Sequence, residues 1–181
     1  MPYAPPPELA ALSLTEVAEL VAARKLPPVD AWRPAQSGDS EMVIKADGRW
    51  FHQGGLISRP AMVRAFASLL WRDEAGQHWL VTPYEKLAIA VEDAAFIAVD
   101  VKQADGALVF RLNTDEFVIA GPDHPIIARG EPDTPALYVA ARHGAHARLN
   151  RSTYGQLVEM ALESGDLAVT SQGTRFALVP A

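Results

Sequence analysis

The stretch LAIAVEDAAFIAVDV, residues 87–101, decides the fold class. Large apolar side chains alternate with smaller ones over 87–91, and the alternation returns over 97–101, which is the period of two typical of a β-strand. Glu92 and Asp93 interrupt the pattern and predict a turn or a bulge between two strands. The sequence therefore predicts two consecutive strands near the middle of the chain.

Strands of the same kind are expected on both sides of this stretch. Asp47-Gly48 is a strong signal for a hairpin turn, and the polar residues 36–40 are expected to form a loop. Because the strands come in hairpins and do not alternate with helices, the predicted fold class is α+β with antiparallel sheets. The further strands are expected at 78–81, 108–112 and 117–119, and the hairpins over 42–57, 138–149 and 169–179.

Three helices have recognisable start signals. Ser13 and Glu16 have the spacing of a capping box, so a helix is expected over 14–24. Ser58 and Asn150 are expected to be the N-caps of two further helices, because each precedes apolar residues at helical spacing.

The two later helices belong to an internal similarity. Residues 57–62 align with 149–154, since in both places a strand pair is followed by a capping residue, an arginine and an amphipathic helix. Residues 76–81 align in the same way with 173–178. The sequence thus predicts a duplicated β-β-α-β core.

The similarity divides the chain into three parts. Residues 1–40 are expected to form an N-terminal helix and an extended, proline-rich arm, because proline favours extended backbone. Residues 41–104 are predicted to form a first α+β subdomain, and residues 105–181 a second one.

Composition and charge exclude several classes of protein. The chain has 181 residues, of which 16 are basic and 22 acidic, and the net charge of −6 disfavours a protein that coats duplex nucleic acid. The absence of cysteine excludes disulfides, thiol catalysis and the usual structural zinc sites. No apolar stretch approaches the ~20 residues that cross a bilayer, and residues 1–7 lack the features of a secretory signal. We therefore expect a cytoplasmic protein that does not bind membranes.

The carboxylates beside the central strands are the first candidates for catalysis. Glu85, Glu92 and Asp93 would serve acid–base chemistry or bind magnesium if the fold brought them together. The alternative is that they are turn residues flanking a strand, with Lys86 as a salt-bridge partner.

The sequence contains no phosphate-binding glycine loop, no nucleophile elbow and no zinc-binding helix motif. His143 and His146 have the spacing of two metal ligands, but no third ligand is near them in the sequence. We interpret them as solvated residues of a hairpin, and no metal or cofactor is expected.

Acidic residues are missing from two windows of the chain. Residues 48–72 and 134–158 contain 25 residues each and no aspartate or glutamate. Within these windows Arg59 and Arg151 each follow an expected N-cap, where the helix dipole disfavours a cation and free N–H groups bind anions. Each copy of the core is therefore a candidate anion-binding corner. The alternative is an exposed arginine that pairs with a distant carboxylate.

Trp50 and His52 lie in the first of these windows. In a strand the two side chains share one face and Phe51 takes the other. If Phe51 belongs to the core, Trp50 is a candidate stacking surface for a planar ligand beside Arg59. The alternative is that Trp50 is a core residue.

Several segments of the chain also carry a family resemblance. They are residues 26–34, 47–59, 62–70, 79–86 and 91–96, together with Arg151 and Tyr154 in the expected last helix. These segments are similar to the bacterial domain-of-unknown-function family 1285 (DUF1285). The resemblance implies an α+β protein with a duplicated core and a C-terminal half loosely similar to pleckstrin-homology barrels. It also implies a ligand site in the groove between the halves, for a nucleotide-like molecule in signalling.

The residues and the resemblance together predict a non-enzymatic binding and signalling module whose ligand is small, anionic and of a nucleotide-derived kind. The alternatives are a hydrolase or transferase that acts on such a ligand through the three carboxylates, and a protein–protein adaptor. The candidate ligand-binding residues are Trp50, His52, Arg59, Arg64, Thr82, Glu85, Lys86, Glu92, Asp93, Arg151 and Tyr154.

Overall fold

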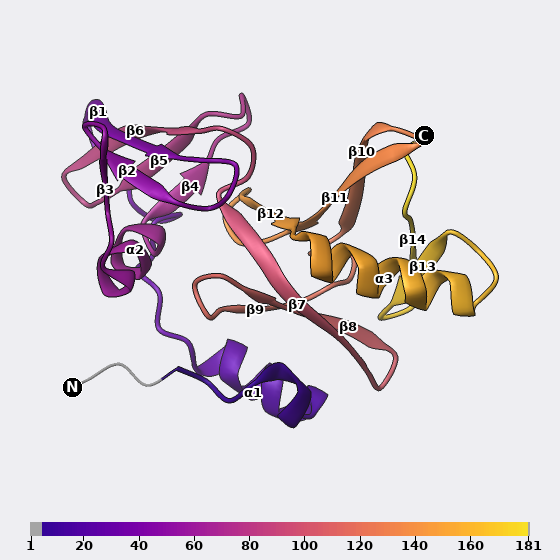
Figure 1. The fold of residues 1–181 in the computed structure, drawn as a ribbon. Coiled ribbons are helices and arrows are strands. Elements are labelled where there is room, and N and C mark those ends of the chain that lie inside the picture. The colour runs from indigo at the N-terminus through magenta and orange to yellow at the C-terminus, as the bar shows by residue number, and fades with distance from the viewer. Residues whose placement is uncertain (1–4, 181) are drawn as a thin grey trace. The chain divides into compact units, whose positions relative to one another are not determined.

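The computed structural model describes residues 5–180, which form two compact units. The first unit contains residues 25–96 and the short segment 142–146. Of the described residues, the second contains 5–24, 97–141 and 147–180. Each unit contains one six-stranded sheet, and the second also has a two-stranded hairpin (Figure 1).

The sheet of the first unit has the strand order β3-β2-β1-β6-β5-β4. Strand β1 pairs antiparallel with β2 and parallel with β6, so the sheet is mixed. Helix α2, Pro60–Ala67, lies between β3 and β4 in the sequence. The strands are β1 Gln36–Ile44, β2 Trp50–His52, β3 Gly55–Leu56, β4 Leu70–Arg72, β5 His78–Val81 and β6 Glu85–Val91.

The parallel pair corrects two sequence predictions. Residues 36–40 were expected as a loop, but they belong to β1 and pair with the start of β6. The Ser40 hydroxyl donates to the carbonyl of Ala88 at 2.7 Å, which fixes the register of the two strands. Because residues 36–39 are all exposed, they carry no apolar alternation that would have marked a strand. The prediction of purely antiparallel sheets is also wrong, because β1 and β6 run parallel.

The sheet of the second unit has the strand order β10-β11-β12-β7-β8-β9. Helix α3, Arg151–Glu163, follows β12, and the hairpin of β13, Ala168–Ser171, and β14, Thr174–Ala177, comes last. The six strands are β7 Phe96–Ala104, β8 Ala107–Leu112, β9 Phe117–Ile119, β10 Ile126–Glu131, β11 Thr134–Ala140 and β12 His146–Leu149.

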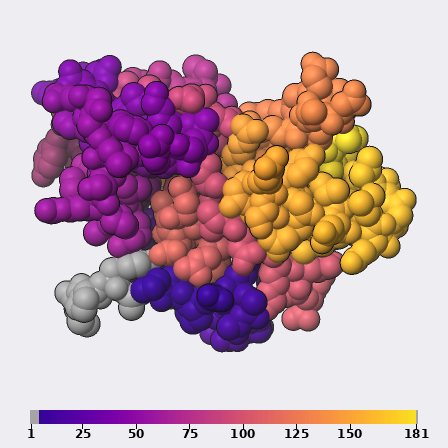
Figure 2. All heavy atoms as spheres, viewed as in Figure 1, coloured from indigo at the N-terminus to yellow at the C-terminus, as the bar shows by residue number. Residues whose placement is uncertain are grey.

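The first part of the N-terminal arm, residues 5–24, belongs to the second unit, whereas residues 25–40 belong to the first. The short helix η1, Leu9–Ala11, leads into α1, Leu14–Ala23, which begins with the predicted capping box of Ser13 and Glu16. Helix α1 contacts β8 and β9, and Figure 2 shows the indigo arm lying against these pink strands. Leu9 and Val17 are buried there in one cluster with residues of the sheet.

The two sheets share one strand order, which is consistent with a duplicated sheet unit. Each consists of two three-stranded meanders, and the first strand of the first meander lies beside the last strand of the second: β1 beside β6, and β7 beside β12. The predicted match of the two helices is wrong, however. Helix α2 lies between the two meanders of its sheet, whereas α3 follows both.

Each unit has its own apolar core. In the first, the largest fully buried side chains include Ile44, Trp50 and Leu70. In the second they include Phe110 and Leu157. None of the helices within residues 5–180 has the length and apolarity needed to cross a bilayer.

Candidate functional site

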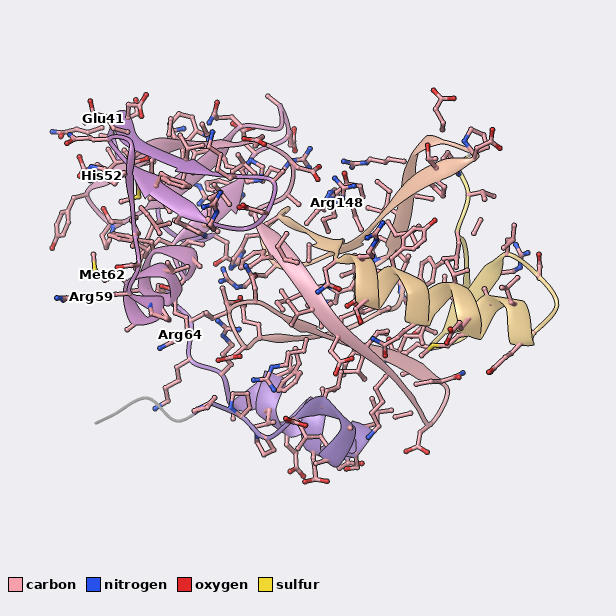
Figure 3. The ribbon with its side chains drawn as sticks, in the orientation of Figure 1. Glu41, His52, Arg59, Met62, Arg64 and Arg148 are labelled. Atoms are coloured by element: carbon pink, nitrogen blue, oxygen red, sulfur yellow. The ribbon has the colours of Figure 1, made fainter. Side chains whose placement is uncertain are left out.

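The start of α2 differs from the sequence prediction. The N-cap is Arg59 itself, not Ser58, and it makes no side-chain capping bond. Pro60 explains the shift, because proline suits the first helical position and fixes the residue before it as the cap. The carbonyl of Arg59 accepts from the backbone N–H groups of Met62 and Val63. The exposed Arg59 side chain points away from α2 in Figure 3 and makes no ion pair with another described residue.

The start of α3 is as predicted. The Asn150 side chain accepts from the backbone N–H of Thr153 at 2.9 Å and is the N-cap. Arg151 is the first helical residue, is exposed, and forms no ion pair within residues 5–180. Tyr154 is half-buried one turn later. Arg151 and Tyr154 therefore belong to the second unit, whereas the other candidate residues belong to the first.

The stacking surface expected at Trp50 does not exist. Trp50 is 2% exposed and lies opposite the fully buried Ile44 in the β1–β2 pair. Phe51 faces outward instead, with the guanidinium carbon of Arg49 5.4 Å from its ring centroid. Because neighbouring residues of a strand face opposite sides, the core position of Trp50 excludes it from a ligand surface. His52 is exposed at the end of β2.

The three carboxylates do not form one cluster. Glu85 is the first residue of the seven-residue strand β6, and Glu92 follows its last residue. At about 3.3 Å per residue the two lie roughly 20 Å apart along the strand. Glu92 pairs with Lys45, 3.4 Å away, and not with an arginine from an acid-free window as we expected. Asp93 is half-buried in the following turn.

No metal site replaces this cluster. Within the part of the chain that the structure describes, no three histidines, cysteines or carboxylates lie close enough together to hold a metal ion.

Three further candidate residues have structural roles in the first unit. The Thr82 hydroxyl accepts from the backbone N–H groups of Tyr84 and Glu85, at 3.3 and 3.1 Å, and so orders the predicted turn between β5 and β6. The ammonium of Lys86 lies 4.3 Å from the ring centroid of Trp79. Arg64 is half-buried in the last turn of α2, where the helix dipole favours a cation.

A group of basic side chains outside the sequence-based candidates gathers at the edge of the first sheet. Arg72 on β4 lies directly opposite His78 on β5. The backbone N–H of Arg72 donates to the carbonyl of His143 at 2.9 Å, and its Nη1 lies 3.5 Å from the carbonyl oxygen of Gly144. The segment 142–146 therefore lies beside β4, the edge strand of the first sheet. We call Arg72, His78, Arg142, His143 and His146 the basic cluster.

Local backbone geometry holds the segment in place. Gly144 has a φ of +78°, and a Cβ built there would lie 2.7 Å from the carbonyl oxygen of Arg72. Only glycine allows this conformation and this close approach together. The Arg142 Nη2 donates to the carbonyl of Ala67 at 2.8 Å, and its guanidinium carbon lies 5.3 Å from the ring centroid of Phe96.

Burial and neighbouring charges lower the pKa of two histidines of the cluster, His78 and His143. Burial is the main cause that lowers the pKa of His78 to about 4, and the charges of Arg72 and His146 lower it further. Burial and Arg142 also lower the pKa of His143. Burial lowers the pKa of Arg142 to about 10, so its guanidinium remains charged at neutral pH.

Asp73 and Asp30 oppose the shifts of His78 and His143. Asp73 raises the pKa of His78, and Asp30 raises that of His143. The Asp73 carboxylate accepts from the indole N–H of Trp79 at 3.0 Å and from the backbone N–H of Gln77 at 2.9 Å. These bonds lower the pKa of Asp73, so it stays ionised at neutral pH.

The sequence shows that most residues of this cluster lie in acid-free windows, but it does not show that the two windows contact each other. Arg72 ends the first acid-free window, and residues 142–146 lie inside the second. His143 and His146 were expected to be solvated, but both are half-buried. Hydrogen bonds from Arg72 to the carbonyl of His143 and from Arg142 to the carbonyl of Ala67 bring parts of the two windows together.

Comparisons with known proteins identify the family. Residues 27–94 match the family model described as domain of unknown function DUF1285, N-terminal domain, and residues 95–178 match the corresponding C-terminal domain. A crystal structure of a DUF1285 family protein from Silicibacter pomeroyi DSS-3 is 36% identical, over 93% of this chain and 96% of that one, with a TM-score of 0.76. A second, from Shewanella baltica OS155, is 24% identical over 65% and 90% of the two chains, with a TM-score of 0.53, and shows likeness of fold. No curated protein matches the sequence significantly.

Proposed function

This chain belongs to the DUF1285 family, whose descriptions name no activity, and from the basic cluster we propose that it is a non-enzymatic module that binds a small anionic ligand. In this proposal the ligand is of a nucleotide-derived kind and is a signal, not a substrate. The candidate site lies within the first unit, at the edge of its sheet.

The meeting of the two acid-free windows carries the proposal. Two guanidiniums and three imidazoles gather in a chain whose net charge is −6, and the backbone bond from Arg72 to His143 fixes the segment that supplies three of them. Guanidinium and imidazole N–H groups are the donors that phosphate and carboxylate oxygens accept best.

Binding is favoured over catalysis because the expected acid–base group is dispersed. Glu85 and Glu92 stand at opposite ends of β6 and cannot act on one substrate atom. The basic cluster itself offers donors that hold an anion.

The finer interpretation of the fold is part of the same proposal. We interpret the two sheets as copies of one ancestral unit, and their common strand order supports this. We also retain the loose likeness of the second unit to pleckstrin-homology barrels, which the six strands followed by α3 support.

Thermal unfolding with a panel of nucleotides, each with and without Mg²⁺, tests the proposal. A ligand at 100 times its Kd stabilises the folded state by about 2.7 kcal/mol, which a melting curve resolves easily. We expect Arg72→Gln to weaken binding at least tenfold, since it removes a charge-assisted donor. Arg59→Gln is the matched comparison, because Arg59 is the anion-binding candidate that the sequence suggested in the same unit.

The outcomes separate the alternatives. If Arg59→Gln weakens binding and Arg72→Gln does not, the site lies at the start of α2 and the basic cluster is not involved. If no nucleotide or other small anion shifts the melting temperature, the proposed function is wrong. Turnover of a bound nucleotide would instead make the protein an enzyme.

A further inference from the structure

The pairing of Arg72 with His78 in the basic cluster limits the kind of anion that the cluster can bind. We infer that its ligand presents a dianionic group of the phosphate or sulfate type, and that His78 gains a proton when this group binds. The inference rests on the proposed function, since it concerns the same site.

Strand pairing places the two central side chains together. Arg72 and His78 are direct partners across β4 and β5, so their side chains leave the sheet on the same face, with Cβ atoms roughly 5 Å apart. The segment 142–146, bound to the edge of β4 through Arg72, brings His146 close enough to act on His78 electrostatically. Arg72 and His78 thus face each other on one side of the sheet, within electrostatic reach of His146.

Without a ligand, the surroundings oppose a charge on His78. Burial, Arg72 and His146 all disfavour the imidazolium, and Asp73 is the charged group that favours it. The carboxylate of Asp73 already accepts hydrogen bonds from the indole of Trp79 and from the backbone N–H of Gln77. His78 therefore stays neutral at neutral pH.

A bound dianion reverses this balance. Pairing with Arg72 neutralises one of its two negative charges, and the second remains to stabilise an imidazolium on the facing His78. The single negative charge of a monocarboxylate is neutralised by the same pairing with Arg72. No charge then remains to stabilise a proton on His78. The cluster thus selects for a dianion, and binding draws one proton from the solvent.

Sulfate is the appropriate probe, because its charge is constant between pH 8 and pH 6 and any pH dependence comes from the protein. We would measure the Kd of sulfate by isothermal titration calorimetry at pH 8, 7 and 6, with sodium chloride holding the ionic strength constant. Uptake of one proton makes binding up to tenfold tighter for each unit of falling pH. Acetate, the monoanion control, should bind more weakly and with little pH dependence.

Two variants assign the proton. His78→Gln keeps a polar donor but cannot titrate, so it should still bind sulfate at pH 8 and lose the tightening at pH 6. His124→Gln, in the second unit, should keep the wild-type dependence. If His78→Gln does not fold, NMR titration of the five histidines of the wild type replaces it: sulfate should raise the pKa of His78.

Three results would overturn the inference. A sulfate Kd that is the same at pH 8 and pH 6 contradicts proton uptake but leaves an anion-binding function intact. A pH dependence that survives in His78→Gln assigns the proton elsewhere. Failure of sulfate to bind even at pH 6 removes the dianion site, whereas the nucleotide melts decide the proposed function separately.

Discussion

The backbone N–H of Arg72 donates to the carbonyl of His143 at 2.9 Å, and this bond joins the segment 142–146 to strand β4 of the first unit. The arrangement depends on Gly144, whose position leaves no room for a Cβ beside the carbonyl of Arg72. A change at Gly144 should therefore disturb the basic cluster without touching any of its side chains.

We expect Gly144→Ala to lower the free energy of unfolding by about 2–3 kcal/mol, from the strained backbone and the close contact together. Gly54→Ala is the matched control, because Gly54 has a similar φ of +81° and no atom within 4 Å of the position that an added methyl group would take. It should cost only about 1 kcal/mol. Urea unfolding of both variants measures the difference, and equal losses would show that the contact with Arg72 is unimportant.

The stability of the protein should depend on pH through His78. Its pKa is about 4 in the folded state and near 6.5 in the unfolded chain, so between these values the unfolded state binds a proton that the folded state does not. The stabilisation is complete above pH 6.5 and is lost as the pH falls toward 4. With allowance for screening by water, we expect a loss of about 2 kcal/mol.

Urea unfolding at pH 7 and pH 4.5 measures this loss, and His78→Gln should reduce it. If the stability of the His78→Gln variant falls with pH as steeply as that of the wild type, groups other than His78 cause the effect.

The helix caps give a third prediction, in which the two capping candidates behave differently. Asn150→Ala should lower the free energy of unfolding by about 1 kcal/mol, because it removes the bond to the backbone N–H of Thr153. Ser58→Ala should change it little, since Arg59 is the N-cap of α2. Thermal unfolding of the two variants compares them, and an equal cost would restore Ser58 as a capping residue.

Local signals predicted local structure well. Ser13 and Glu16 form the expected capping box, and Gly48 adopts the positive φ that its hairpin turn requires. Asn150 caps α3 because its side chain needs only a neighbour three residues away. These features depend on a few adjacent residues, and the sequence contains all of them.

Long-range pairing could not be predicted in the same way. The parallel pairing of β1 with β6 involves exposed polar residues that carry no pattern, so residues 36–40 resembled a loop. The burial of Trp50 depends on which side of β2 faces the core, and a strand one residue out of register exchanges its faces. The basic cluster depends on hydrogen bonds between distant segments, from Arg72 to His143 and from Arg142 to Ala67.

The last prediction concerns the contact of α1 with the sheet of the second unit. Arg24, at the end of α1, has its Nη1 2.5 Å from a carboxylate oxygen of Glu116, which is only 6% exposed. The Thr114 hydroxyl donates to the other oxygen at 2.6 Å. Removing the arginine leaves a buried carboxylate without this partner, so Arg24→Met should lower the free energy of unfolding by about 1–3 kcal/mol.

A double-mutant cycle with Glu116→Gln isolates the contribution of this pair. Because the amide is uncharged, Arg24→Met should cost much less in the Glu116→Gln background, and urea unfolding of the four proteins gives the coupling energy. Arg175→Met is the control in the same unit, since the ion pair of Arg175 with Asp166 is exposed and its loss should have little effect. If the effects of Arg24→Met and Glu116→Gln simply add, the ion pair does not hold α1 against the second sheet.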